Sequence, residues 1–282
     1  MDMSIFDSSP LSNCTICVLT HNRKEQLCLT LSNIREEFGE DFINVVVLNN
    51  GSSDSTTDFL NQLSGEWPQL KVVHSNENLG CAMGREITWK EAPSDYILSM
   101  DDDIIVERCS LLAMLHILRE ENGAGIVSPI IIDSVSGRTL NPIAGNSLNA
   151  DFFYEGCFLI RASLIHAIGY LDPVLAIAGE GLDYSIRARK AGFSIVRSPG
   201  ARVLHVDRVR DADQTMRRRQ DWLWSFSYLY WKNYSPPVAL ILSIRIFVAH
   251  VASAFPLYGW GFCLSLPRYA VSGAMHGRRF RV

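Results

Sequence analysis

The first hundred residues alternate between short apolar runs of strand character and segments with helical spacing. The apolar runs cover residues 15–19, 43–48, 70–74 and 96–100, and the segments between them cover 24–38, 56–63 and 82–90. Within 24–38, Leu27, Leu31 and Ile34 recur at the spacing of one helix face. A repeated strand-helix order is typical of a parallel sheet covered by helices on both faces. The sequence therefore predicts an α/β fold.

Each of the four predicted strands is followed by a polar loop. The loops comprise residues 20–23, 49–54, 76–80 and 101–103. Ligands of such sheets bind at the carboxyl ends of the strands, where these loops would meet. Any one loop also fits ordinary turn or helix-cap chemistry, because Asn-Gly pairs, Ser and Asp serve those purposes too. The convergence of all four loops on one edge favours a binding site.

Three consecutive carboxylates, Asp101, Asp102 and Asp103, end the fourth apolar run. Like charges this close repel one another and call for a counter-ion. Hard oxygen ligands suit Mg²⁺ or Mn²⁺, and two residues spaced like Asp101 and Asp103 project to the same side of an extended chain. We therefore expect a divalent cation here that neutralises a phosphate; a solvated acidic turn is the alternative.

Charge divides the chain into two parts. Residues 1–200 hold 14 Lys and Arg against 26 Asp and Glu, a balance of −12, whereas 201–282 hold 12 against 4, a balance of +8. The 282 residues, 48% of them hydrophobic, provide material for a large α/β domain and an appendage. We predict two parts with different partners, an α/β domain over 1–210 and an extension over 211–282.

The cysteines and the N-terminus indicate a reducing location. The seven cysteines are scattered, and the pair Cys14 and Cys17 has no second pair to complete a zinc site, so reduced core thiols are expected. The first seven residues are acidic and lack the basic and apolar regions of a secretory signal. We expect a cytoplasmic protein with no nucleic-acid partner.

The ordered motifs resemble those of the family 2 nucleotide-sugar glycosyltransferases, and among these the rhamnosyltransferase-like members. The resemblance spans about residues 14–206 and is carried by the four loops, with the Asp triplet in the place of the D-x-D motif, and by later motifs at 156–161, 168–173, 180–187, 191–193, Pro199 and His205. It implies a GT-A fold, that is, a mixed, mostly parallel sheet flanked by helices. It also implies a UDP- or dTDP-sugar donor and Mn²⁺ or Mg²⁺ as cofactor. The C-terminal part lies beyond the resemblance, and its own residues predict a helical hydrophobic extension.

The resemblance also assigns roles to the loop residues. Asp103 and His205 would coordinate the metal, Asp101 would assist, and Asp102 would hold the ribose. Residues expected to bind the donor are Thr20, Asn22, Arg23, Asn49, Asn50, Ser52, Asp54, Gly80 and Arg85, with Arg85 either at the diphosphate or merely on a helix face. Asn49 departs from the Asp usual in the family, since an amide can accept a hydrogen bond from the base but carries no charge.

The catalytic base is a second departure from the family. Gly181 stands where the family commonly has the Asp near the acceptor, but Glu180 and Asp183 remain. We expect Glu180 to take the acceptor proton, so that turnover collapses in Glu180→Gln while donor binding survives. Asp183 either binds the acceptor or anchors the helix that follows, as an N-terminal carboxylate favoured by the helix dipole. A base facing the leaving group across the sugar predicts single-step displacement and inversion of the anomeric carbon.

The extension combines basic, aromatic and apolar stretches. Seven aromatic residues fall in 222–234, next to Arg217, Arg218 and Arg219, and 238–255 is mostly apolar but interrupted by Arg245 and His250. A spanning helix needs about 20 uninterrupted apolar residues, so helices lying on an anionic membrane surface at its inner face are expected. A lipid-linked or other glycan acceptor of cell-envelope assembly would suit this location. A homo-oligomer interface and a lid over the catalytic domain are the alternatives.

Two other functions compete with sugar transfer. Asp101 and Asp103 after a strand also look like the nucleophile motif of haloacid-dehalogenase phosphatases, although that motif normally lies on the first strand. A scaffold that binds nucleotide sugar without catalysis is suggested by Asn49 and Gly181. Phosphate-ester hydrolysis would favour the former, and donor binding without turnover the latter.

Overall fold

The N-terminal half forms parallel strands joined by helices, as the alternation predicts. The computed structural model describes residues 11–279 apart from 12, 42, 142–148, 176–177 and 207–211. Strands β1 (Cys14–Thr20), β2 (Asn44–Asn50), β3 (Leu70–Ser75) and β4 (Tyr96–Asp101) pair in parallel in the order β3-β2-β1-β4. The connecting helices are α1 (Lys24–Phe38), α2 (Thr56–Glu66) and α3 (Gly80–Lys90), with a short 3₁₀ turn η1 (Gly39–Asp41) after α1. Each predicted strand and helix is confirmed, with bounds that differ by a few residues.

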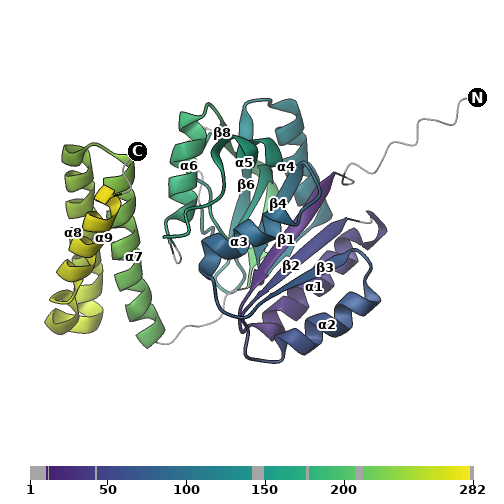
Figure 1. Ribbon diagram of the computed structural model, residues 1–282, viewed down its shortest axis with the longest axis horizontal. Helices are drawn as coiled ribbons and strands as arrows, with labels where there is room; N and C mark the ends of the chain where they lie inside the picture. Colours follow the sequence, from purple (N-terminus) through teal and green to yellow (C-terminus); the bar gives the residue numbers. More distant parts are fainter. Residues whose placement is uncertain are drawn as a thin grey trace, which may run out of the picture.

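Helices cover both faces of the sheet (Figure 1). Helices α1, α2 and α4 (Arg108–Glu120) pack on one face, and α3, α5 (Ala162–Ile168) and α6 (Glu180–Lys190) pack on the other. Alternate residues of β1 serve the two cores, with Ile16 and Val18 in the first and Cys17 in the second. Burial on both faces explains why the strands read as continuous apolar runs. The two cysteines of the predicted reduced pair, Cys14 and Cys17, are free and buried.

The second half of the sheet mixes strand directions and brings distant residues to the Asp triplet. Strands β6 (Ala124–Asp133), β7 (Cys157–Arg161) and β8 (Ser194–His205) extend the sheet, with β7 antiparallel to β4 and to β6. The short β5 (Ile104–Val106) begins directly after Asp103 and pairs antiparallel with β8, so that Ile104 lies opposite His205. This register places His205 beside the end of the triplet. The predicted mixed, mostly parallel GT-A-type sheet is thus confirmed.

Three helices form the C-terminal extension: α7 (Ala212–Asn233), α8 (Pro236–Cys263) and α9 (Leu266–Arg279). In Figure 1, α7 faces the α/β domain, and α8 and α9 lie beyond it. Helices α7 and α9 approach closely because Gly273 and Gly277 have no side chain: a Cβ at either position would collide with the carbonyl groups of Trp224 and Tyr228, respectively.

Helix α8 is apolar and largely uncovered. Within the described residues, its stretch Pro236–Leu257 is long and apolar enough to cross a membrane by length and composition, and only 11% of it is buried. The exposed apolar side chains along it are Val238, Leu240, Ile241, Ile244, Val248, Phe255 and Leu257. This criterion tolerates a single charge such as Arg245, so it does not separate a spanning helix from one that lies on a membrane surface, and the surface location expected from the sequence stays a prediction.

Candidate active site

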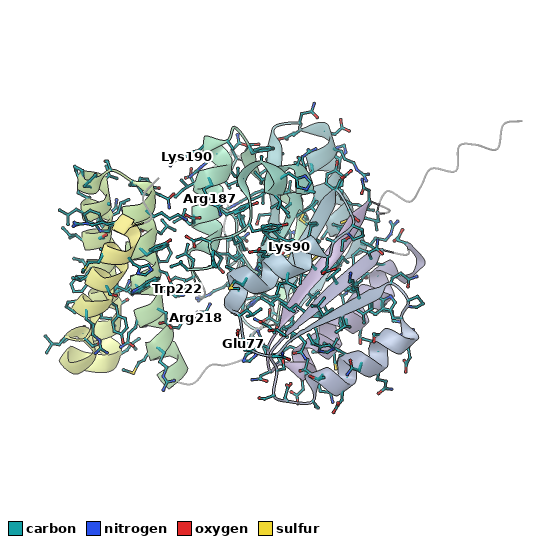
Figure 2. The ribbon with its side chains drawn as sticks, viewed as in Figure 1. Glu77, Lys90, Arg187, Lys190, Arg218 and Trp222 are labelled. Carbon is teal, nitrogen blue, oxygen red and sulfur yellow. The ribbon has the colours of Figure 1, made fainter. Side chains whose placement is uncertain are left out.

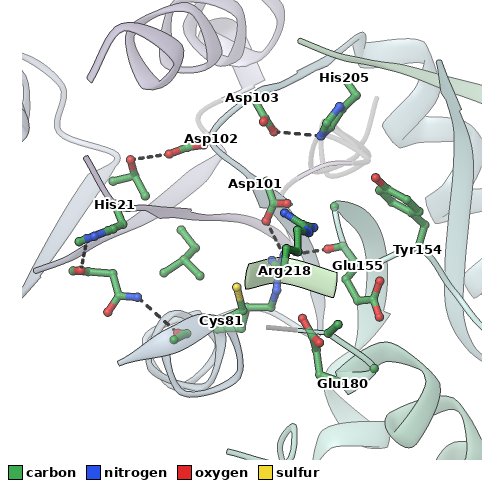
Figure 3. A pocket seen from close by; sticks show the side chains of 18 of the residues that line it. His21, Cys81, Asp101, Asp102, Asp103, Tyr154, Glu155, Glu180, His205 and Arg218 are labelled. Carbon is green, nitrogen blue, oxygen red and sulfur yellow. Dashed lines mark hydrogen bonds and ion pairs between the residues drawn. The ribbon is translucent and has the colours of Figure 1, made fainter. Parts of the chain in front are cut away.

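A cavity of about 1000 Å³ opens at the carboxyl edge of the sheet (Figure 3). Its walls include all three aspartates of the triplet and residues from β1, α3, α6 and α7. The predicted site residues that line it are Thr20, Arg23, Asn50, Gly80, Arg85, Asp101, Asp102, Asp103, Glu180 and His205. Segments up to 185 residues apart therefore meet at the edge where the parallel strands end.

Two arginines provide opposite charges for the aspartate triplet. Arg23, in the loop after β1, contacts Asp102 Oδ1 at 3.2 Å and Asp103 Oδ2 at 2.6 Å. Arg85 of α3, which is almost fully buried, contacts Asp101 Oδ1 at 2.5 Å. The protein itself therefore supplies part of the positive charge that the sequence led us to expect from a metal ion. Arg23 and Arg85 lie far from the triplet in the sequence, so no local pattern predicts that they pair with it.

One oxygen of the triplet has no donor and faces a histidine. Asp103 Oδ1 is buried without a hydrogen-bond partner, and His205 Nε2 lies 3.5 Å from it. Among the described residues, no three His, Cys, Asp or Glu side chains gather closely enough to hold a metal by themselves. The Asp103–His205 pair therefore fits a metal ion whose remaining ligands come from a bound diphosphate or water.

Asp102 is buried, and both of its carboxylate oxygens have partners. Thr20 Oγ1 donates to Asp102 Oδ2 at 2.6 Å, and Arg23 lies on the other oxygen. Burial raises the pKa of Asp102 to about 7, against the lowering effect of Arg23 and of the Thr20 hydroxyl. Only a small free-energy change is therefore needed to alter its protonation near neutral pH.

Several predicted donor ligands hold the loops together, and one of them, Asn50, also lines the cavity. Asn50 Nδ2 donates to Asn78 Oδ1 at 3.1 Å, and Asn50 Oδ1 accepts from the Leu79 amide at 2.9 Å, which ties the second loop to the third. Asn22, at φ +53°, accepts a hydrogen bond from the Ser53 backbone amide through its side-chain Oδ1 at 2.7 Å. The backbone amide of Asn22 donates to Ser52 Oγ at 2.9 Å. Asn22 and Ser52 are not part of the cavity lining.

Asn49 and Asp54 also lie outside the lining. The side-chain amide of Asn49 has hydrogen-bond partners nearby in the chain. Its Nδ2 donates to Thr57 Oγ1 at 2.9 Å, and its Oδ1 accepts from the Ser52 backbone amide at 3.2 Å. Asp54 accepts from the Thr56 amide at 3.1 Å at the start of α2. For these two residues the turn and helix-cap alternative describes the contacts better than donor binding.

Two glutamates approach each other at the start of α6. Glu180, the first residue of the helix, is buried, and its Oε2 has no hydrogen-bond partner. Glu155 Oε1 accepts from the Gly181 amide at 3.1 Å. Burial and the neighbouring Glu155 raise the pKa of Glu180 to about 8, and burial also raises the pKa of Glu155. Both glutamates line the cavity.

Asp183 is fully buried and lies outside the cavity lining. It accepts from Arg187 Nε at 2.9 Å on its own helix, and from Lys232 Nζ at 2.8 Å and Asn233 Nδ2 at 2.9 Å on α7. These contacts agree with the expected anchoring of the helix, and acceptor binding by Asp183 stays a prediction.

Sequence reasoning missed part of the cavity wall. Arg218, Trp222 and Phe226 of α7 line the cavity, and Figure 2 shows Arg218 and Trp222 projecting from α7 toward the α/β domain. Their spacing of four residues places them on one helix face, and this spacing is the signal in the sequence that could have identified them. Glu155 and Tyr154 also line the cavity, and no motif marks them.

The sheet order, the Asp triplet at its carboxyl edge and the cavity define a GT-A-type domain. The chain belongs to glycosyl transferase family 2, whose family model matches residues 15–169. The family assignment removes the haloacid-dehalogenase alternative.

Two curated relatives match the N-terminal part of the chain. The teichoic acid poly(glycerol phosphate) polymerase of Staphylococcus epidermidis is 25% identical over 121 residues, 43% of this chain and 16% of that protein. The uncharacterized glycosyltransferase YfnE of Bacillus subtilis is 27% identical over 113 residues, 40% of this chain and 28% of that protein. The matches thus span less than a third of either relative.

Solved structures share the fold over nearly the whole chain. The mannosyltransferase PcManGT from Pyrobaculum calidifontis, in complex with GDP-Man and Mn²⁺, has a TM-score of 0.62 and 16% identity, covering 96% of this chain and 88% of that one. S. aureus TarS 1–349 has a TM-score of 0.66 and 15% identity, covering 94% and 80%. The latter has also been solved in complex with UDP-GlcNAc.

Proposed function

We propose that this protein is an inverting, metal-dependent glycosyltransferase that moves a hexose or deoxyhexose, such as rhamnose, from a UDP- or dTDP-sugar to an acceptor hydroxyl. The observation that carries the proposal is the meeting, in one cavity, of the Asp103–His205 pair with the two glutamates at α6. The first group suits a metal-bound diphosphate, and the second suits removal of the acceptor proton.

The donor would bind at the side of the cavity that the first three loops form. Thr20, Arg23, Asn50 and Gly80 would line the nucleotide, and Asp102 would accept from the ribose hydroxyls. Because Arg85 pairs with Asp101, its guanidinium lies close enough to the triplet to contact the diphosphate as well.

Asp103 and His205 would hold Mn²⁺ or Mg²⁺, with Asp101 assisting. When bound there, the ion would neutralise the charge that develops on the leaving diphosphate. Mn²⁺ accompanies the nucleotide or nucleotide sugar in PcManGT and in the GalNAc-T7 structure, which has a TM-score of 0.62 and 15% identity to this chain. In this chain the buried and unpaired Asp103 Oδ1 is the atom that most needs such a partner.

A thermal-shift panel with and without Mn²⁺ tests the proposal. UDP-glucose, UDP-GlcNAc, dTDP-rhamnose and GDP-mannose are compared at about 100 times Kd, where ligand binding contributes about 2.7 kcal/mol of stability. At about 2–4 °C per kcal/mol, a UDP- or dTDP-sugar should raise the Tm by about 5–10 °C, and the rise should depend on Mn²⁺. A shift with GDP-mannose alone would contradict the choice of donor.

Turnover separates an enzyme from the catalytically impaired scaffold. We expect the bound donor to be consumed and the product to carry the opposite anomeric configuration by NMR. Donor binding without turnover across a panel of acceptors would favour the scaffold, and retention of configuration would contradict the single displacement.

We further propose that the extension attaches the protein to the inner face of the membrane and so presents a lipid-linked acceptor to the cavity. The exposed apolar row of α8 and the balance of +8 over residues 201–282 support this proposal. Helix α7 links the two regions, because it lines the cavity and packs against both α8 and α9. A cell-envelope polymer fits the similarity to the teichoic acid polymerase over the matched stretch.

Vesicle flotation tests this membrane proposal. The protein should float with vesicles that contain phosphatidylglycerol, and the double variant Ile241→Ser/Ile244→Ser should shift most of it to the unbound fraction, since each exposed apolar side chain contributes to burial in the bilayer. Leu29→Ser, which removes an exposed leucine of α1, is the matched control. A detergent-free protein that stays soluble as a stable oligomer would favour the homo-oligomer interface instead.

A further inference from the structure

Glu155 occupies the space that a side chain at position 181 would fill. A Cβ built on Gly181 would lie 2.7 Å from both Glu155 Cγ and Glu155 Oε1, closer than real Cβ contacts allow. The Gly181 amide donates to the same Oε1 at 3.1 Å. The absence of a side chain at 181 therefore admits a carboxylate from a different part of the chain, the segment just before β7.

The two glutamates differ in exposure and in hydrogen bonding. Glu180 is only 4% exposed and has an oxygen without any partner, so its charged form would be buried and poorly compensated. Glu155 is partly exposed, lines the cavity and accepts from a backbone amide at the start of α6, where the helix dipole favours negative charge. When one proton is shared between the two, these surroundings place it on Glu180 and leave Glu155 ionised.

The charged groups around Glu155 are consistent with this division. Burial is the largest influence on the Glu155 carboxyl and raises its pKa, and Asp101 of β4 raises it as well. The Gly181 amide and Arg85 of α3, which donates to the Glu155 carbonyl oxygen at 2.8 Å, lower the pKa and so favour the ionised carboxyl. Figure 3 shows Glu155 and Glu180 on a different side of the cavity from Asp103 and His205. A base separated from the diphosphate site in this way can approach the sugar from the face opposite the leaving group.

We propose that Glu155, rather than Glu180, is the catalytic base, and that Gly181 is required to make room for it. The proposal rests on the glycosyl transfer proposed above. In the step, the acceptor oxygen forms a bond to the anomeric carbon, and its proton passes to the Glu155 carboxylate. The bond from the anomeric carbon to the phosphate oxygen breaks, and its electron pair leaves with the diphosphate. Glu180 keeps its own proton, because its carboxyl is buried with one oxygen unpartnered, and the Gly181 amide holds the Glu155 carboxylate at the cavity.

Matched variants of the two glutamates test the assignment of the catalytic base. The measured rate is the release of nucleoside diphosphate from UDP-glucose, UDP-GlcNAc or dTDP-rhamnose, with water as the acceptor. Glu155→Gln should lower the rate by about 100-fold or more, the range of general-base catalysis, while the Tm rise caused by donor and Mn²⁺ stays as in the wild type. Glu180→Gln should cost about tenfold or less and should shift the pH profile of the rate, since Glu155 loses a coupled neighbour.

A relocated carboxylate provides the rescue experiment. Glu155→Ala empties the space in front of position 181, and Glu155→Ala/Gly181→Asp returns a carboxylate to it, so the double variant should recover at least about tenfold over Glu155→Ala. Gly181→Asp alone should lower the rate, because its side chain would displace the Glu155 carboxyl from this position.

The outcomes separate this inference from the proposed function. A Glu155→Gln protein with at least a third of the wild-type rate overturns the assignment, as does a Glu180→Gln protein that loses the larger share of activity. A wild-type protein that binds none of the donors and releases no diphosphate overturns the glycosyltransferase proposal itself, and this assignment with it.

Discussion

Replacing Asp103 with asparagine should abolish the Mn²⁺-dependent part of the donor-induced thermal shift and lower turnover by about 10³-fold or more. The expected size reflects the several kcal/mol by which a metal stabilises charge on a leaving group, at about 1.4 kcal/mol per tenfold in rate. Asparagine keeps the volume of the side chain but removes the charge of Oδ1, the buried atom that faces His205 at 3.5 Å. Mn²⁺ titration followed by thermal shift measures the binding, and diphosphate release measures the turnover.

Two comparisons make this prediction specific. Asp151→Asn removes the same charge from a side chain that is 93% exposed, and it should leave both measurements unchanged. His205→Gln should weaken Mn²⁺ binding in parallel with Asp103→Asn. If Asp103→Asn retains the Mn²⁺-dependent shift, the metal is held elsewhere and the assignment of this pair fails.

Lys232→Met should lower the free energy of unfolding by about 3 kcal/mol, because it leaves the buried Asp183 and the partly buried Asp172 without their shared cation. Lys232 Nζ lies 2.7 Å from Asp172 Oδ2 and 2.8 Å from Asp183 Oδ1, and its side chain is only 12% exposed. The loss corresponds to a fall in Tm of about 6–12 °C, measurable by thermal or urea unfolding. Because these contacts attach α7 to the α/β domain, donor hydrolysis should fall too, as Trp222 and Phe226 leave the cavity wall.

The pH dependence of the loss follows from Asp172. Burial alone would raise its pKa, but hydrogen bonds from Lys232 and Tyr228 hold the pKa below the ordinary value of 3.8. A lowered carboxyl pKa stabilises the fold above the unfolded-state pKa, and this contribution disappears as the pH falls through the folded-state pKa. The stability difference between wild type and Lys232→Met should therefore be smaller near pH 3 than at pH 7.

Lys90→Met is the control for Lys232→Met. Lys90 pairs with Glu86 on the exposed side of α3 with a side chain that is 53% exposed, and its removal should leave the free energy of unfolding nearly unchanged, because solvent screens an exposed ion pair. Equal losses in the two variants would show that the contacts of Lys232 with Asp172 and Asp183 contribute no more to the free energy of unfolding than a surface ion pair does.

The amino-acid sequence was sufficient for the order of strands and helices in the first hundred residues. The helix predicted over 24–38 is α1, and the four apolar runs are β1 to β4. Periodicity reports which faces of an element are apolar, and parallel strands must end at the same edge of a sheet. For this reason the strand-helix alternation alone places the loops at Thr20, Asn50 and Asp101 together.

Sequence patterns did not distinguish loop residues that face the cavity from those that hold the loops together. Asn49 and Asp54 follow the same turn chemistry as Asn50, yet only Asn50 lines the cavity. Which way a loop side chain points depends on the hydrogen bonds available in the neighbouring loop, and those form only when the strands have paired. The same holds for Asp183, whose partners Lys232 and Asn233 lie about 50 residues away on another helix.

The sequence by itself determined the first four strands of the sheet, the edge at which the site lies and the aspartate triplet there. Only the tertiary structure decided what surrounds those carboxylates: Arg23 and Arg85 as their ion-pair partners, Glu155 in the space left by Gly181, and α7 as a wall of the cavity. The physical reason is one of range. Backbone geometry and apolar spacing act between residues a few positions apart, whereas charge pairing and close packing join residues far apart in the chain and exist only once it has folded.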